Sequence, residues 1–532
     1  MFRKLKFLLI CVNAIYFTGY SQNINDALNY SSNTHQGTAR FNSMSGAFGA
    51  LGGDLSAIAV NPAGSAVFNN GHFSLSFGSE NKSNEAAILN TSNNSDKKNF
   101  TLNQIGGIVT FDNLNGDNNW KKISLAITYN QTKNNFNEYS VFNFTNTNSI
   151  DTYFLNNAQG LRLDQISAFE NETITEAYVD IGNVYGFAHQ QAFLGYESFI
   201  IDPNEFSDNN SSYYSNVQSG TFNQTYRSIS RGYNGKLTAN IGFQYNENLY
   251  FGVNLNSHFI DFDNYTIFNE TNNNGDSGQF RINGIYFENR LSTFGEGFSA
   301  QFGIISKISD FLRIGLTYDT PTWYEISEET TQYLETSMID VDLAEVHNRR
   351  DLDETSPLIT NPNAINIYED YTLKTPSKIT ASTALVFKNI GLISFDYSRR
   401  DYSSMKFKPE TDWHFSDLNQ EISLRLKEVN TYRIGGEILA DRFSFRAGYM
   451  YEDSPYNSLN NPAIPDTDNN IDDSINGFSL GIGYKLNGTT IDLSLVKIES
   501  SKYKRLYDTG LTNQVNVKTE NTALTISVST IF

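Results

Sequence analysis

Three arginines of this chain stand where a charged side chain is unexpected. Arg313, Arg433 and Arg446 each interrupt a segment in which apolar and polar residues alternate. A guanidinium group binds a carboxylate through two parallel hydrogen bonds, so these side chains are candidates for holding an anionic headgroup. They could instead pair with acidic residues such as Glu437 or Asp54 and hold an internal segment in place, and we favour this structural role.

Other reactive residue types lack the spacing that their chemistry requires. The stretch Asp466–Asp472 resembles the start of a calcium loop, but Ile471 and Gly477 stand where that loop needs glycine and glutamate. The chain has no H-E-x-x-H motif, and its six histidines are scattered. The sequence therefore predicts no catalytic residue, no metal site and no cofactor, and we do not expect an enzyme.

The first 21 residues have the features of a secretory signal peptide. A short basic start precedes the apolar run Phe7–Phe17, which is too short to span a membrane as a helix. We expect cleavage near Ser21 and Gln22, which makes residues 1–21 the signal peptide. Cys11, the one cysteine, lies within this segment, so the exported chain would contain no disulfide.

Composition argues for a membrane protein that crosses with strands. The net charge is −20, so nucleic acid is not an expected partner. The mean hydropathy is −0.42 although 14% of the residues are aromatic. After the signal peptide no apolar stretch approaches the roughly 20 residues of a membrane helix. In a barrel strand only alternate side chains face lipid, which reconciles high aromatic content with low hydropathy.

Alternation with a period of two recurs along the chain and predicts strands. Leu237, Ala239, Ile241 and Phe243, for example, alternate with polar or small residues. We predict fourteen strands, within residues 72–80, 99–112, 121–146, 222–246, 249–268, 281–308, 311–336, 366–388, 391–408, 430–440, 443–453, 474–487, 489–503 and 517–532.

The connections between these strands alternate in length. Six are short, whereas the other seven, including 81–98 and 147–221, are long and polar, and 155–200 is expected to contain helices. An even strand number with tight turns at one end is typical of an outer-membrane barrel. The predicted fold is therefore all-β, a fourteen-stranded antiparallel transmembrane β-barrel over residues 72–532. The terminal Phe532 resembles the signal read by the barrel assembly machinery of Gram-negative bacteria.

Residues 22–71 do not alternate and are predicted to form a hatch, or plug, inside the barrel. Glycines are frequent here, notably Gly46, Gly49, Gly52 and Gly53, which indicates a tightly packed non-strand segment. Asp54 could cap a short helix up to Val60. A barrel of fourteen strands is wider than its own side chains fill, so an internal plug would prevent leakage.

The hatch also carries the most specific motif of the chain. Asn61-Pro62-Ala63-Gly64, preceded by the glycine-rich run and followed directly by a strand, resembles the FadL-type outer-membrane transporters. That resemblance implies a fourteen-stranded barrel, an N-terminal hatch and uptake of long-chain fatty acids or aromatic hydrocarbons. Four apolar hatch residues are candidates either for a ligand pocket or for packing of the hatch itself: Phe41, Met44, Phe48 and Leu51.

The expected function is passive uptake of small hydrophobic compounds across the outer membrane, with membrane lipid around the barrel. We expect a ligand to leave after the hatch moves, and a bulge at Gly106 and Gly107 would open a sideways exit. The alternative is a FadL-like barrel that carries or scaffolds secreted proteins, gripped by the long connections 147–221 and 337–365. The sequence alone does not identify the ligand or the oligomeric state.

Overall fold

The structure is a computed structural model that describes residues 22–32, 36–113, 119–275, 281–339, 357–457 and 473–532. The predicted signal peptide and the acidic stretch 466–472 lie outside these described residues.

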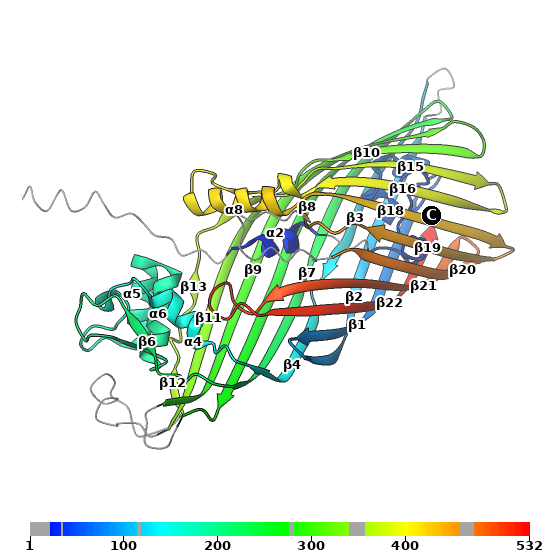
Figure 1. The fold of residues 1–532 in the computed structure, drawn as a ribbon. Helices are drawn as coiled ribbons and strands as arrows, with labels where there is room; N and C mark the ends of the chain where they lie inside the picture. Colours follow the sequence, from blue (N-terminus) through cyan, green and yellow to red (C-terminus); the bar gives the residue numbers. More distant parts are fainter. Residues whose placement is uncertain (1–21, 33–35, 114–118, 276–280, 340–356, 458–472) are drawn as a thin grey trace, which may run out of the picture.

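The strands form one closed antiparallel barrel (Figure 1). Strand β1 pairs with β2 on one side and with the last strand, β22, on the other, which closes the sheet. Twenty strand segments make up fourteen barrel strands, because four of these strands are interrupted. In chain order they are β1 (His72–Ile88), β2 (Thr91–Asp112), β3 and β4 (Trp120–Asn134, Asn137–Asn146), β7 (Phe222–Tyr245), β8 (Leu249–Asn272), β9 (Arg281–Lys307), β10 and β11 (Leu312–Asp319, Trp323–Ile339), β12 to β15 (Leu358–Thr360, Asn366–Ile367, Tyr371–Lys374, Lys378–Phe387), β16 and β17 (Gly391–Asp401, Lys406–Lys408), β18 (Glu428–Ala440), β19 (Phe443–Glu452), β20 (Ile475–Leu486), β21 (Thr489–Arg505) and β22 (Gln514–Ile531). The predicted fourteen-stranded barrel is confirmed.

The alternation places apolar side chains outside and polar ones inside. Phe478 and Leu480 are each 61% exposed, whereas Ser479 between them is buried. Exposure of so many large apolar groups is unfavourable in water but is what a lipid-facing belt requires. The parity rule also places Arg433 and Arg446 inside, and both are buried.

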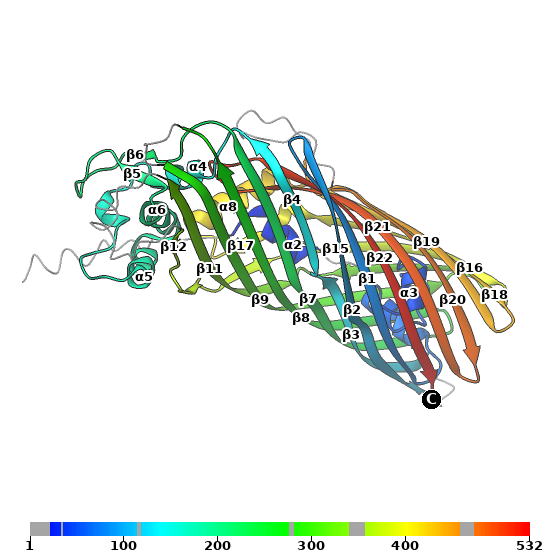
Figure 2. The ribbon, with the colours of Figure 1, turned by 90° about the horizontal axis from the view of Figure 1, so that it is seen from below.

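The tight turns that join β7 to β8, β9 to β10, β15 to β16, β18 to β19 and β20 to β21 lie at one end of the barrel, together with the C-terminus (Figures 1 and 2). Four of these turns contain Asn246, Asn389, Asp441 or Asn487 with positive φ. Asn and Asp tolerate the left-handed conformation better than other non-glycine residues, which explains their recurrence. Phe532 donates its backbone N–H to the carbonyl of Gly71, where the chain enters β1.

The predicted long connection 81–98 is wrong. Strands β1 and β2 continue through it and are joined by a turn at Leu89 and Asn90. Most of the segment is polar on both faces, so hydrophobic alternation does not reveal the strands. The backbone groups of β1 and β2 nevertheless remain paired with each other throughout it. The strands here exceed the roughly ten residues needed to cross the bilayer.

Helices gather at the end opposite the tight turns (Figure 1). The connection between β4 and β7 forms α4 (Asp151–Ala158), η3 (Leu163–Gln165), α5 (Ile174–Tyr185), α6 (Phe187–Glu197) and the short strands β5 (Ile201–Pro203) and β6 (Tyr213–Ser215). The helices expected within 155–200 are thus confirmed. Their apolar residues share a buried core with the inner faces of β1, β7, β8, β9, β11 and β22. We call the unit formed by residues 147–221 the cap.

The N-terminal segment lies at two levels inside the barrel (Figure 2). Helix α2 (Ile24–Ser31) packs against α8 (Trp413–Arg425), an element that the sequence did not predict. Helices α3 (Ala39–Ser43), η1 (Ser56–Ala59) and η2 (Pro62–Val67) lie in the tight-turn half; residues 37–68, which contain them, are called the plug below. The remaining short helix, η4 (Tyr402–Ser404), separates β16 from β17.

Among the described helices, none combines the length and apolar character needed to cross a membrane.

Candidate ligand cavity and the plug beneath it

The Asn-Pro-Ala-Gly motif docks the plug on the barrel wall. The Asn61 amide donates to the carbonyls of Gly49 (2.7 Å) and Ile304 (3.1 Å), while its oxygen accepts from the N–H of Ala63. Asn61 therefore caps η2 and joins it to β9. Pro62 begins η2, where a missing N–H costs nothing, and its carbonyl accepts from Asn240 of β7.

Glycines allow the plug to fold tightly and to touch the wall. Gly46, Gly52 and Gly53 have φ between +62° and +75°, a region that other residues rarely adopt. The backbone of Gly52 packs directly against Gly64. Gly49 lies against β15 and β16, where its N–H donates to Asp396 at 2.9 Å.

An ion-pair chain fixes the plug to the opposite wall. Arg40 of α3 binds Glu437 through two hydrogen bonds of 3.0 and 3.1 Å. Glu437 also accepts from Arg446, which in turn contacts Asp492 at 2.6 Å. Both carboxylates are buried, and each has a cationic partner, so their burial is compensated.

The three arginines singled out from the sequence occupy separate positions around the plug. Arg446 belongs to the ion-pair chain, Arg313 donates to the carbonyl of Leu51 at 3.0 Å, and Arg433 is buried near Asp396. All three lie beside plug residues or their wall partners, and none lines the cavity described below. Arg40 and Asp492 complete the ion-pair chain but were missed, since neither stands out in the sequence before the pairing of strands is known.

A glycine of β8 tests the docking of the motif. A Cβ added at Gly252 would lie 2.2 Å from the carbonyl carbon of Pro62 and 2.4 Å from the nitrogen of Ala63. We expect Gly252→Ala to push η2 from the wall, lower stability by about 1–3 kcal/mol and raise the ion conductance of the purified barrel in planar bilayers. Gly107→Ala is the control, because its Cβ would approach nothing closer than 3.7 Å. Equal conductance of the two variants would contradict this role.

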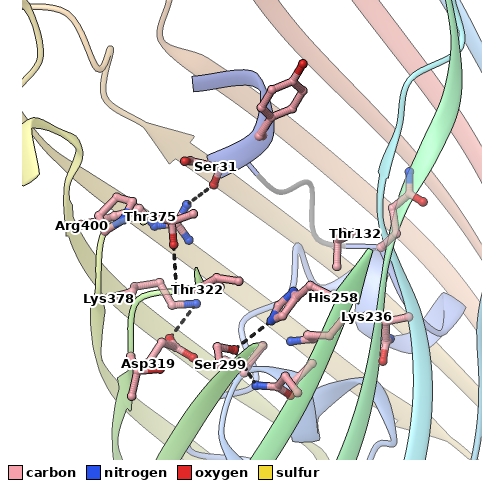
Figure 3. A pocket seen from close by; sticks show the side chains of 18 of the residues that line it. Ser31, Thr132, Lys236, His258, Ser299, Asp319, Thr322, Thr375, Lys378 and Arg400 are labelled. Carbon is pink, nitrogen blue, oxygen red and sulfur yellow. Dashed lines mark hydrogen bonds and ion pairs between the residues drawn. The ribbon is translucent and has the colours of Figure 1, made fainter. Parts of the chain in front are cut away.

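A cavity lies above the plug and below α2 (Figure 3). It contains about 880 Å³ of empty space, including its open approaches. Tyr30 and Ser31 form its roof, Phe41 and Val60 belong to its floor, and the inner faces of the barrel strands form its walls.

Cationic side chains exceed acidic ones around this cavity. Lys236, Lys378 and Arg400 line it, whereas Asp319 is the one carboxylate among the lining residues. Lys378 contacts Asp319 at 3.0 Å, and Arg400 donates to the carbonyl of Ser31 at the end of α2 (Figure 3). The positive excess makes the cavity suited to an anionic group.

These cavity cations were missed in the sequence. Lys236 and Lys378 stand in the polar phase of alternating strands, and the same inward-phase rule applied to the arginines would have found them. Of the four apolar candidates, Phe41 lines the cavity. Met44, Phe48 and Leu51 pack within the plug and against Ala384 of β15.

Beside the cavity, two neighbouring strands of the barrel wall are joined, within the described residues, by side chains and not by backbone hydrogen bonds. The backbone ladder between β2 and β3 ends at Gln104 and Asn130. Beyond that point the described contacts are made by side chains, such as Asn99 with Asn134 (3.3 Å). We call this boundary the seam. Asn130 and its neighbours Gln131 and Thr132 line the cavity, so the cavity reaches the seam.

The expected bulge at Gly106 and Gly107 is wrong. Both glycines pair in register with β1 and β3. The irregularity lies at Asn103, the extra residue between the partners of Ser76 and Phe77. Gly106 instead allows close pairing, because a Cβ there would lie 2.8 Å from the carbonyl oxygen of Ile127.

A closed barrel with an apolar outer belt, a polar interior and an internal plug is the architecture of an outer-membrane channel protein. The family model described as outer membrane protein transport protein (OMPP1/FadL/TodX) matches residues 210–532. The chain therefore belongs to this family of outer-membrane transport proteins of Gram-negative bacteria, which confirms the resemblance drawn from the hatch motif. No curated protein sequence matches the chain.

Three solved structures are similar to this chain at low sequence identity. A Pseudomonas aeruginosa FadL homologue has a TM-score of 0.52 and 11% identity, covering 94% of this chain and 100% of its own. The P. putida toluene transporter TodX has a TM-score of 0.49 and 11% identity, with 94% and 99% covered. The Ralstonia pickettii toluene transporter TbuX has a TM-score of 0.47 and 12% identity, with 94% and 99% covered.

Proposed function

We propose that this transport protein lets a small hydrophobic compound with a carboxylate headgroup, such as a long-chain fatty acid, pass the outer membrane passively. The observation that carries the proposal is the cavity between α2 and the plug, where three cations face one carboxylate. Neutral aromatic compounds are the other candidate class, because two of the similar structures are toluene transporters. A surplus of half-buried cations would give such neutral molecules no advantage.

The headgroup site is tested at Lys236, for whose side-chain amino group no hydrogen bond or ion pair is found within the described residues. We expect Lys236→Met to weaken binding of oleate to the purified protein by roughly 10- to 100-fold, the value of one charge-assisted hydrogen bond. Binding of toluene should not change. Lys406→Met, in an exposed ion pair with Glu410, is the control. Unchanged oleate affinity in Lys236→Met would contradict a headgroup at this position.

The seam is the proposed sideways route between cavity and bilayer. A double variant, Asn99→Cys with Asn134→Cys, would allow a short thiol-specific reagent with a cleavable disulfide to cross-link β2 to β3 where only side chains bridge them. We expect the cross-link to reduce oleate uptake by cells several-fold, and a reductant to restore it. Each single cysteine variant, treated in the same way, is the control. Full uptake by the cross-linked protein would show that the ligand does not pass here.

The remaining assignments belong to the same proposal. Residues 1–21 act as the cleaved signal peptide, 22–71 as the hatch with its Asn-Pro-Ala-Gly motif, and 72–532 as the barrel in membrane lipid. The assembly machinery reads Phe532, which is 70% exposed. The protein catalyses no reaction. Neither the comparisons nor the described residues support the alternative of a carrier for secreted proteins.

A further inference from the structure

Unpartnered polar side chains line the cavity beside its cations. Asn130 is 3% exposed, and within the described residues neither its amide nitrogen nor its oxygen has a hydrogen-bond partner. On the roof, the Ser31 hydroxyl and the Gln36 amide oxygen are likewise buried without a partner in that part of the chain. All three residues line the cavity.

The register of the strands places Asn130 next to the proposed headgroup site. Asn130 of β3 stands directly opposite Lys236 of β7, and Lys236 stands opposite His258 of β8. Inward-facing partners in one such row are about 5 Å apart at their Cβ atoms. A carboxylate held by Lys236 would therefore bring the first few atoms of the ligand's body alongside Asn130.

The neighbouring polar groups do not satisfy Asn130. His258 and Asn256 both contact the hydroxyl of Ser299, at 2.8 and 3.1 Å (Figure 3). These hydrogen bonds connect the three residues with one another and not with Asn130. A buried amide without a partner is unfavourable, and an alkyl chain packed on it would exclude water while leaving both of its atoms unpaired. A ligand hydroxyl or amide in the same place would both donate to and accept from Asn130.

We propose that the ligand of this cavity is a carboxylic acid that carries a hydroxyl or amide group close to its headgroup, rather than a plain fatty acid or hydrocarbon. The inference rests on the proposed function, since it assumes that the carboxylate binds among Lys236, Lys378 and Arg400. A site built to hydrogen-bond a ligand group discriminates strongly against the analogue that lacks it, because its own polar groups are then left unpaired.

Three acids of equal chain length test this with the purified full-length protein in detergent. Calorimetry would compare 3-hydroxyhexadecanoate, hexadecanoate and 16-hydroxyhexadecanoate. We expect the 3-hydroxy acid to bind at least tenfold more tightly than the other two. The 16-hydroxy acid controls for polarity, because its hydroxyl lies at the far end of the chain from the carboxylate.

Asn130→Leu should remove this preference while hexadecanoate still binds, and Asn130→Ala is the second variant if the leucine variant does not assemble. Equal affinities of the wild-type protein for the 3-hydroxy acid and hexadecanoate would overturn the inference and leave the proposed function standing. A preference that survives in the Asn130 variants would overturn the role of Asn130. Binding of none of the three acids would overturn both proposals.

Discussion

Replacement of Arg40 by alanine is expected to open the barrel at its tight-turn end. The substitution removes both hydrogen bonds that join α3 to Glu437 and leaves that buried carboxylate with Arg446 as its remaining cation. Loss of one partner from a largely buried ion pair costs about 3–5 kcal/mol, and the part exposure of Arg40 (23%) favours the lower value. Because α3 lies at the wall of β19 to β22, the plug should loosen on that side.

Ion conductance in planar bilayers measures this effect. We expect Arg40→Ala to give long-lived open channels where the wild-type protein is mostly closed. Arg399→Ala is the matched control, because Arg399 forms an exposed ion pair with Glu428 on the barrel and such pairs add little stability. If Arg40→Ala stayed as closed as this control, the plug would be held by its other contacts.

A disulfide between the plug and the wall is expected to stop transport. A Cβ added at Gly49 would lie 2.9 Å from that of Ser382, somewhat closer than the about 3.8 Å of a relaxed disulfide, so a small shift permits the bond. The only native cysteine, Cys11, lies in the predicted signal peptide, so no other thiol competes. With Gly49→Cys and Ser382→Cys oxidised, oleate uptake should fall to that of cells without the protein.

The reduced form of the same double variant provides the reference, and uptake should return when the disulfide is broken. Ser382→Cys alone, exposed to the same oxidant, controls for damage elsewhere. Unimpaired uptake by the oxidised protein would mean that the ligand leaves the cavity while the plug stays in place. The sideways route through the seam would then account for the whole passage.

The local sequence pattern predicted most of the barrel, because contact with lipid requires an apolar side chain at every second position of a strand. A strand that crosses the bilayer must turn every second side chain to hydrocarbon, so the phase of Ile434 placed Arg433 inside without any knowledge of its partners. Outside the bilayer this constraint ends. The polar extension of β1 and β2 therefore carried no alternation and was taken for a loop.

The cavity could not be predicted in the same way, because it depends on pairing between distant segments. Lys378 meets Asp319 only through the register of β10 and β15, and Arg400 reaches Ser31 across 369 positions of sequence. Helix α8 packs on α2 although the two helices are far apart in the sequence. The phase of the alternation identifies which side chains face the lumen. It does not say which of them lie at the same height in the barrel, or which of them line the cavity.

The length of the long strands determines where the protein meets its ligand. Strand β9 has 27 residues, which at about 3.3 Å each extend for roughly 90 Å. At a tilt near 40° this gives a height of roughly 70 Å, against an apolar band of about 25 Å. Most of the length of these long strands therefore stands above the bilayer, among the saccharides that coat a Gram-negative cell. A sparingly soluble molecule would be taken up in that hydrated layer, before it had to partition into lipid.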